Sequence, residues 1–382
     1  MNRLPAETLA HIFRLAVPSF TARDEPRRPF KDEDRKTLKT CTLVSRQWRH
    51  VATPLLYTNV ELRFNEAQGL FLRTVEAKPE LGKRVRSVGI DYFPMEAGMP
   101  GDKKRTENVR RIAIACPNVQ SVRLNRHQNI EAKVLAQFTD LRELVLMGNL
   151  SFWDDDLPTF PRLVVLSLQP TVFNMKSGVS PLAWLCPTYL PSLRALALDH
   201  LPTRVQPFLP LQQFPNLRAF AGFGNRYSCS EVLTIPKDSL PPFSIIHVSA
   251  RAIRSDPDCD GWVDPNQTYA LDPCYLLHGT HVFLYRSDEF RGSEATSILE
   301  ELKAAIKHLD TLPPGEVRLK GIFVSRENLY DQDGGRNVVR GLRSVCSPRG
   351  IEVTVVDSGK EHLPGDRPMF PDGFVEMALK ET

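Results

Sequence analysis

The first apolar positions of the chain recur with the period of a helix. In the segment LPAETLAHIFRLAV, residues Leu9, Ile12, Phe13 and Ala16 lie at i, i+3, i+4 and i+7, which places them on one side of a helix. The proline at position 5 suits a first helical turn, and Pro18 ends the pattern. The spacing therefore predicts an amphipathic helix that stops before Pro18.

A second apolar stripe follows a strongly charged segment. Residues 18–37 combine prolines with many charges, which predicts an exposed loop. Thr53 and Pro54 are typical of the N-cap and the first turn of a helix, and they predict a short third helix over residues 55–57. Helices this short bury little apolar surface alone, so this region is expected to need a partner. The stripe of the second predicted helix consists of Leu38, Cys41, Val44, Trp48 and Val51.

One template, L-x-x-L-x-L with apolar substitutions, recurs farther along the chain. Its occurrences begin 34, 22, 22, 30 and 24 residues apart, and each alternates as a short strand does. Helical stripes follow in Thr106–Cys116 and Ile130–Phe138, a helix is predicted from Ser180 to Leu185, and the Pro-rich segment 202–215 is predicted to be irregular. The triplets are Val85, Val88 and Ile90; Val119, Val122 and Leu124; Leu141, Leu144 and Leu146; Leu163, Leu166 and Leu168; Leu193, Leu196 and Leu198; and Leu217, Phe220 and Gly222.

The remaining sequence continues the alternation of strands and helices. Strand and helix patterns with short returns predict an α/β fold in which parallel strands follow one another as a solenoid over residues 61–357. The alternative division has repeats over 61–226 and a separate α/β domain over 227–357. Residues 358–382 are predicted to form a tail. Strand patterns cover 243–250, 281–287, 317–325 and 351–356, and helical patterns cover 293–309 and 337–346.

The N-terminal motifs resemble a known family. LPAETLAHIF followed by LVSRQWRHVATPLLY resembles an F-box, a three-helix module, over residues 3–57, in the style of basidiomycete fungal F-box proteins. We assign residues 1–60 to it; the alternative is an ordinary helical cap on the repeat region. The resemblance implies docking on a Skp-type adaptor, and the family's adaptor-contacting positions are Leu4, Pro5, Leu9, Ile12, Phe13, Val44, Ser45 and Trp48.

The repeats resemble an irregular leucine-rich-repeat array. LRELVLMGN and LRAFAGFGN keep the family's asparagine as Asn149 and Asn225. Together the two resemblances imply a substrate-recognition subunit of a Skp–cullin–F-box ubiquitin ligase, which binds the adaptor, and through it a cullin, by the F-box and an unknown target protein by the repeats. Such a subunit contributes no catalysis of its own. The alternative is a leucine-rich-repeat scaffold that acts outside a ligase.

The target is expected on the strand face of the array. Residues between the triplet positions point away from the core, and apolar residues exposed there would mark an interaction site. The alternative is that the tail or a connector covers them. The predicted row contains Gln120, Ser121, Arg123, Arg142, Glu143, Val145, Val164, Val165, Ser167, Arg194, Ala195 and Ala197. Within it, the target-binding candidates are Arg123, Arg142, Val145, Val165 and Arg194.

Charge and cysteine content narrow the class of protein. A net charge of +4 and a basic window at 81–126 without interleaved aromatic residues do not indicate nucleic-acid binding. The seven cysteines are scattered and form no CxxC pair, which favours reduced thiols. No stretch is apolar enough to span a membrane or resembles a signal peptide. The sequence thus predicts an intracellular protein, cytoplasmic or nuclear, without a membrane contact.

No motif predicts a cofactor, a metal or an enzymatic reaction. DPDCDGWVDPNQ (256–267) has aspartates at calcium-loop spacing, but Gln267 stands where the bidentate glutamate is needed. A metal site could be formed by Cys274, His278 and His281, but the sequence offers no fourth ligand at a suitable spacing. In addition, His281 is the first residue of a strand pattern. P-loop, GxSxG and GxGxxG motifs are missing from the sequence. We therefore expect a binding protein and no enzyme.

Overall fold

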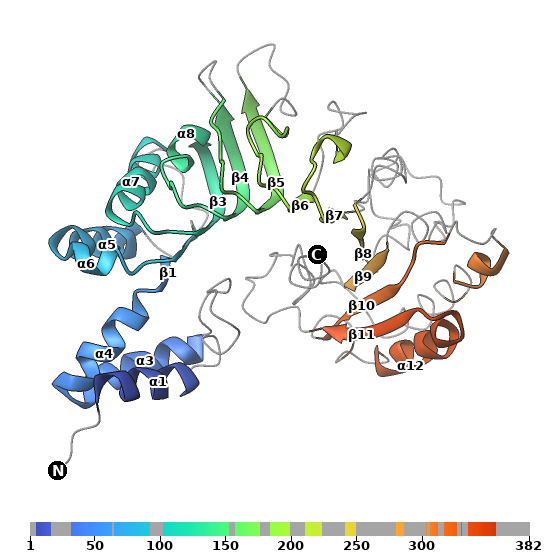
Figure 1. The fold of residues 1–382 in the computed structure, drawn as a ribbon, viewed down its shortest axis with the longest axis horizontal. Helices are drawn as coiled ribbons and strands as arrows, with labels where there is room; N and C mark the ends of the chain where they lie inside the picture. Colours follow the sequence, from blue (N-terminus) through green and yellow to red (C-terminus); the bar gives the residue numbers. More distant parts are fainter. Residues whose placement is uncertain are drawn as a thin grey trace, which may run out of the picture. The chain divides into compact units, whose positions relative to one another are not determined.

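The fold is mixed α/β: strands pair in parallel and helices pack beside them, which confirms the predicted class (Figure 1). Two compact units divide the chain, Met1–Ser192 and Leu193–Thr382, and their boundary falls between the fourth and fifth apolar triplets. The structure, a computed structural model, describes residues 5–16, 32–62, 65–91, 102–152, 157–175, 184–198, 211–223, 241–249, 280–285, 303, 306–311, 317–326, 330 and 335–356.

The first unit opens with the helices α1 (Ala6–Ala16), α3 (Asp32–Val44) and α4 (Arg46–Leu56). Two boundaries predicted from the sequence are wrong. α3 starts inside the predicted 18–37 loop, because three acids in its first turn suit the positive end of the helix dipole. α3 and α4 meet at Ser45, not at Thr53, and α4 continues through Pro54. Pro54 lies in the last turn, where its missing N–H costs one hydrogen bond without ending the helix.

The strands of the first unit pair in parallel in chain order. They are β1 (Asn59–Leu62), β2 (Ser87–Asp91), β3 (Ser121–Glu131), β4 (Glu143–Phe152) and β5 (Val165–Met175). Just before each of β2 to β5, a backbone N–H donates to the carbonyl of the matching residue one strand earlier. The N–H of Arg86 donates to the carbonyl of Thr58 at 2.8 Å. In the same way, the N–H of Gln120 donates to the carbonyl of Arg86 at 2.7 Å, and the N–H of Arg142 donates to the carbonyl of Gln120 at 2.7 Å. These bonds form one rung per strand and fix the register.

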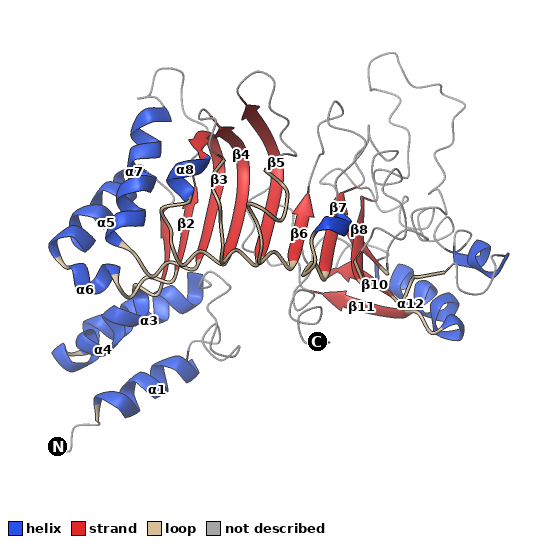
Figure 2. Cartoon of the chain, turned by 45° about the horizontal axis from the view of Figure 1, so that its top comes forward, coloured by secondary structure: helices blue, strands red, loops and turns tan. Residues whose placement is uncertain are grey.

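Helices lie beside the first four of these strands (Figure 2). They are α5 (Asn65–Ala77), α6 (Pro79–Gly82), α7 (Asp102–Ala115) and α8 (Ala132–Leu135). α7 packs on β3, and α8 packs on β3 and β4. Arg111 of α7 reaches Glu76 of α5 with two N–H···O bonds of 2.7 and 2.8 Å from one guanidinium nitrogen. The predicted stripe 130–138 is only partly helical, because β3 continues through Ile130, and Trp184 and Leu185 lie in a turn instead of a helix.

The second unit repeats the parallel pairing in chain order. Its strands are β6 (Ala195–Leu198), β7 (Ala219–Phe223), β8 (Phe243–Ser249), β9 (His281–Tyr285), β10 (Gly321–Ser325) and β11 (Glu352–Val356). The last four fall within the strand patterns predicted from the sequence. The same rungs recur: Arg218 N–H donates to Arg194 at 2.8 Å, and Lys320 N–H donates to Thr280 at 2.7 Å.

Short helices connect these strands. They are η3 (Leu211–Gln213), η6 (Leu309–Thr311), α12 (Gly335–Cys346) and η8 (Ser347–Arg349). α12 matches the helix predicted over 337–346. Of the helix predicted over 293–309, Lys303 and residues 306–308 are helical, and 293–302 and 304–305 lie outside the described residues, as does the predicted tail. Gly350 ends η8 with a φ of 69°, a left-handed conformation that glycine adopts without strain.

The apolar triplets form the core of both units. Every position of the six triplets is buried, Gly222 included. Val88, Val122, Leu144 and Leu166 stand opposite one another across β2–β5, so the triplets stack strand upon strand. This stacking is what the L-x-x-L-x-L alternation predicts.

Candidate protein-binding site

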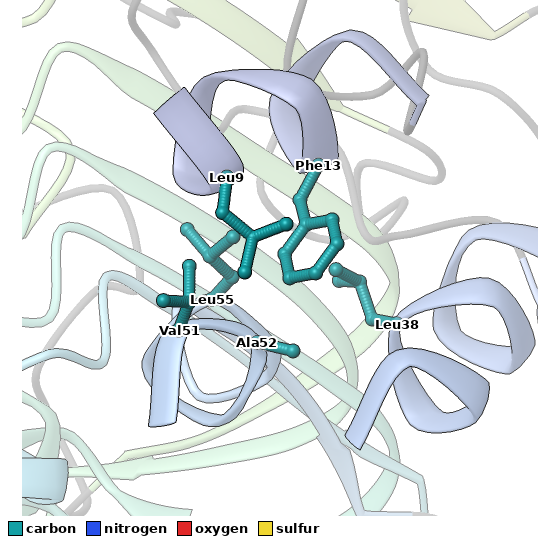
Figure 3. Packing of buried hydrophobic residues seen from close by; sticks show 6 residues of the cluster. All are labelled: Leu9, Phe13, Leu38, Val51, Ala52 and Leu55. Carbon is teal, nitrogen blue, oxygen red and sulfur yellow. The ribbon is translucent and has the colours of Figure 1, made fainter. Parts of the chain in front are cut away.

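The three N-terminal helices enclose a small core of their own (Figure 3). Phe13 of α1 and Leu38 of α3 approach each other above Ala52 of α4. Trp48 is half-buried and meets the ring of Phe13 edge to face, with ring centroids 5.0 Å apart and an interplanar angle of 64°. The helices are therefore held together by an apolar interior, whose buried residues are Leu9, Phe13, Leu38, Val51, Ala52 and Leu55.

Polar contacts fix the junction between α3 and α4. Ser45 has extended backbone angles, and its Oγ accepts from the N–H of Trp48 at 3.2 Å, which makes it the N-cap of α4. From the next turn, Arg49 Nε donates to the carbonyl of Thr42 at 3.1 Å. This bond satisfies a carbonyl at the end of α3 that has no helical partner. Ser45, predicted as an adaptor contact, thus has a structural role at the junction.

The predicted adaptor contacts separate into buried and exposed side chains. Leu9 and Phe13 are almost fully buried, so they hold α1 in place and cannot touch a partner while the helices stay packed. Ile12 is 41% exposed and Val44 is 57% exposed, and Pro5 is also exposed. Leu4 lies outside the described residues. Of the large predicted apolar contacts, Ile12 and Val44 are exposed and Trp48 is partly exposed, so a partner can reach these three.

Two further exposed apolar residues were not predicted as contacts. Leu15 is 59% exposed and Leu43 is 73% exposed. The exposure of Leu43 was missed because the sequence analysis assumed one helix that runs through Ser45. That helix places Val44 in the buried stripe and gives Leu43 no role. The position of Ser45 itself, a strong N-cap residue, was the signal that could have revealed the junction.

The second candidate site is the row of target-binding residues on the strands. In the first unit, Arg123 and Val145 stand side by side in the register of β3 and β4 and are partly exposed, and Arg142 is exposed. Glu61 of β1 belongs to the same row: it pairs with Arg35 at 3.8 Å and lies over Gly89 of β2. A polar surface therefore covers the start of this row.

The expected exposure of the later positions is wrong. Val165 is only 7% exposed, and Ser167, Ala195 and Ala197 are buried. At these positions the sequence has replaced charged side chains by valine, serine and alanine, which are residue types that fit a covered surface. Val165 is therefore a packing residue, whereas Arg194, in the second unit, is exposed.

The one predicted metal candidate that the structure describes is packed among aromatic rings. His281 stacks on Phe323 and Phe243, with ring centroids 5.4 and 6.4 Å apart, and its Nδ1 lies 3.0 Å from the hydroxyl of Thr280. Burial, helped by the nearby Lys320 charge, lowers the pKa of His281 to about 4. The described residues include no group of three His, Cys, Asp or Glu that could hold a metal ion. Cys274, His278 and the loop 256–267 lie outside them.

Burial makes three of the described cysteines poor nucleophiles. Burial raises the pKa of Cys116 to about 12 and that of Cys346 to about 11, so both thiols stay protonated at neutral pH. Cys41 also has a raised pKa, because burial outweighs the opposing backbone hydrogen bond. These positions hold packing thiols.

Two comparisons complete the description of the chain. Within the described residues, no helix has both the length and the apolar character needed to cross a membrane. A scan against protein-family models gave no match, and no curated protein matches the chain.

Proposed function

We propose that the chain is the substrate-recognition subunit of a Skp–cullin–F-box ubiquitin ligase, with the N-terminal helices as its F-box. The observation that carries the proposal is the arrangement of α1, α3 and α4. Their interior is closed by their own side chains, yet Ile12 and Val44, at motif positions, remain exposed. Large apolar side chains left in water on a small helical module favour a protein partner.

The repeat region takes the role of target holder in this proposal. Strands that pair in parallel and in chain order, with a stacked apolar core, support a leucine-rich-repeat-like array. The exposed Arg142 and the partly exposed Arg123 and Val145 form the surface that we assign to the target in the first unit. Ubiquitin transfer would follow from proximity, since this chain supplies binding and no reacting group. The protein would act in the cytoplasm or the nucleus.

Reconstitution with purified components tests the proposal. The full chain, mixed with a Skp-type adaptor and a cullin, should elute as one complex in size-exclusion chromatography. Ile12→Asp combined with Val44→Asp should abolish co-elution while preserving the circular-dichroism spectrum, because both side chains are exposed. The matched control is Leu70→Asp with Ile114→Asp, two exposed apolar residues on α5 and α7.

The outcomes separate a ligase subunit from a scaffold. Loss of co-elution in the Ile12 and Val44 variant, with retention in the control, supports docking through the helices. A wild-type chain that never associates with the adaptor overturns the proposal and favours a repeat scaffold that works outside a ligase.

A further inference from the structure

In the second unit, the side of β6 and β7 that points away from the core is apolar and covered. Ala195 and Ala197 of β6 alternate with the core leucines of the fifth triplet, so their side chains lie on the opposite side of the strand. The parallel register sets Ala219 and Ala221 of β7 beside them. We call this side the outer face. All four alanines have an exposed fraction of 0%, so other atoms of the same chain must lie on the outer face.

The outer face continues across the next strands as a diagonal of stacked rings. The stacked rings of Phe243, His281 and Phe323 belong to β8, β9 and β10, and each lies two residues farther along its strand than the one before. Gly321 makes room for this arrangement, because a Cβ there would lie 2.8 Å from Cδ2 of His281. Phe243 and His281 are each only 8% exposed. Cover therefore extends from the alanines to the first two rings.

The described helices of the second unit do not account for this cover. α12 packs on β11, and within the described residues no helix makes an extensive contact with β6 or β7. Crossovers between parallel strands are right-handed, so the connectors of a solenoid return on one side of the sheet, which is the side of the core. A segment that follows the last strand has no further strand to reach. The chain after β11 is therefore the part that is free to lie on the outer face.

The sequence after β11 has the length and the side chains for this position. Residues 357–382 belong to the second unit and lie outside the described residues. Five strand spacings of about 4.8 Å separate β11 from β6, so about seven extended residues span the distance. Large side chains suit a face built of alanine, because small residues leave room for them. The segment 369–379, MFPDGFVEMAL, supplies Met369, Phe370, Phe374, Val375, Met377 and Leu379.

We propose that residues 369–379 lie across the outer face of β6 and β7 and cover its four alanines with their apolar side chains. A second copy of the chain is not needed, since the alanines are covered in a single copy. The inference does not depend on the proposed F-box function. Within that function, a target can reach the exposed Arg194 but must displace the segment to touch Ala195 or Ala197. The segment is thus an intrachain competitor for part of the predicted target surface.

Thiol labelling of the full chain tests this cover. Ala197→Cys places a thiol on the outer face, and its reaction with N-ethylmaleimide would be followed by peptide mass spectrometry. We expect this thiol to stay unlabelled. Phe370→Asp with Phe374→Asp should speed its labelling at least about tenfold, because acidic side chains do not bind an apolar face. A synthetic peptide of residues 366–382, but not a scrambled one, should restore the protection in this variant.

Matched controls separate uncovering from unfolding. His362→Asp with Lys380→Asp introduces the same acid at two polar positions of the C-terminal segment and should leave the thiol at position 197 protected. The native Cys346 is fully buried in α12 and should stay unlabelled in every variant. Arg194→Cys, at an exposed position beside β6, should react in every variant.

Photo-cross-linking identifies the occupant without disturbing the segment. In the full chain, p-benzoylphenylalanine would replace Phe370, and cross-links within one chain to peptides that carry β6 or β7 support the proposal. Cross-links confined to other parts of the chain, or formed only between two chains, overturn it. A thiol at position 197 that reacts freely in the otherwise wild-type chain also overturns it. If Cys346 becomes labelled in the Phe370 and Phe374 variant, that variant has unfolded and the cross-links decide.

Discussion

At the scale of single residues, the neighbours Ile12 and Phe13 of α1 differ in their surroundings. Phe13 fills the interior and meets Trp48 edge to face, whereas Ile12 faces water. Phe13→Ala should lower the free energy of unfolding of the three-helix unit by about 3 kcal/mol. Ile12→Asp should leave this stability unchanged and cost about 2 kcal/mol of adaptor affinity. Thermal melts and adaptor titrations of both variants check the split, and a large drop in melting temperature for Ile12→Asp would contradict it.

His281 gives the second unit a dependence on pH. An unfolded chain takes up the imidazole proton near its ordinary pKa of 6.5, whereas the folded chain does so only near pH 4, because the ring is buried. The stability is therefore complete above pH 6.5 and is lost as the pH falls toward 4, by at most about 3 kcal/mol. Urea unfolding at pH 7 and pH 5 should show this loss in the wild type and a smaller one in His281→Asn. Equal losses in the two proteins would assign the effect to other groups.

At the scale of elements, two glycines mark close approaches of different kinds. A Cβ at Gly82 would lie 2.1 Å from the carbonyl oxygen of Ala115, so α6 touches the backbone at the end of α7. A Cβ at Gly89 would lie 2.3 Å from the carboxylate of Glu61, which is the flexible end of a side chain. Gly82→Ala should therefore cost about 2 kcal/mol or more, and Gly89→Ala about 1 kcal/mol or less, through the partly exposed Arg35–Glu61 pair. Chemical denaturation of both variants measures the difference, and equal losses would contradict it.

The sequence predicted elements better than their ends or their surroundings. Apolar alternation located the buried side of each strand, because the triplet positions record burial directly. Helix ends were less certain, since Ser45 and Thr53 are both good N-caps and only packing decides between them. Alternation also says which residues leave the core of a strand, but not what covers the opposite side. For this reason Val165 and Ala197 were expected to be exposed, although both are buried.

At the scale of the whole molecule, the proposal separates adaptor binding from target binding. Arg123→Glu with Arg142→Glu reverses charge on the strand row and should abolish target capture without affecting the adaptor. One pull-down from cell extract, probed for the adaptor and by mass spectrometry for other proteins, measures both. Val165→Asp is the informative contrast, since it buries a charge and should lower the melting temperature. Loss of the adaptor from the arginine variant, or retention of every target, would refute this placement.

The backbone hydrogen bonds that form the rungs before the strands affect how the sequence of such a chain can evolve. Each of these hydrogen bonds joins a strand only to the strand before it. The same bond forms between strands whose starts lie 22 residues apart and between strands whose starts lie 34 residues apart. An insertion or a deletion between two rungs therefore alters a connector while the pairing of the neighbouring strands is kept. Connectors can thus diversify quickly around a constant frame, so related chains could come to hold different proteins while their strands stay in the same order.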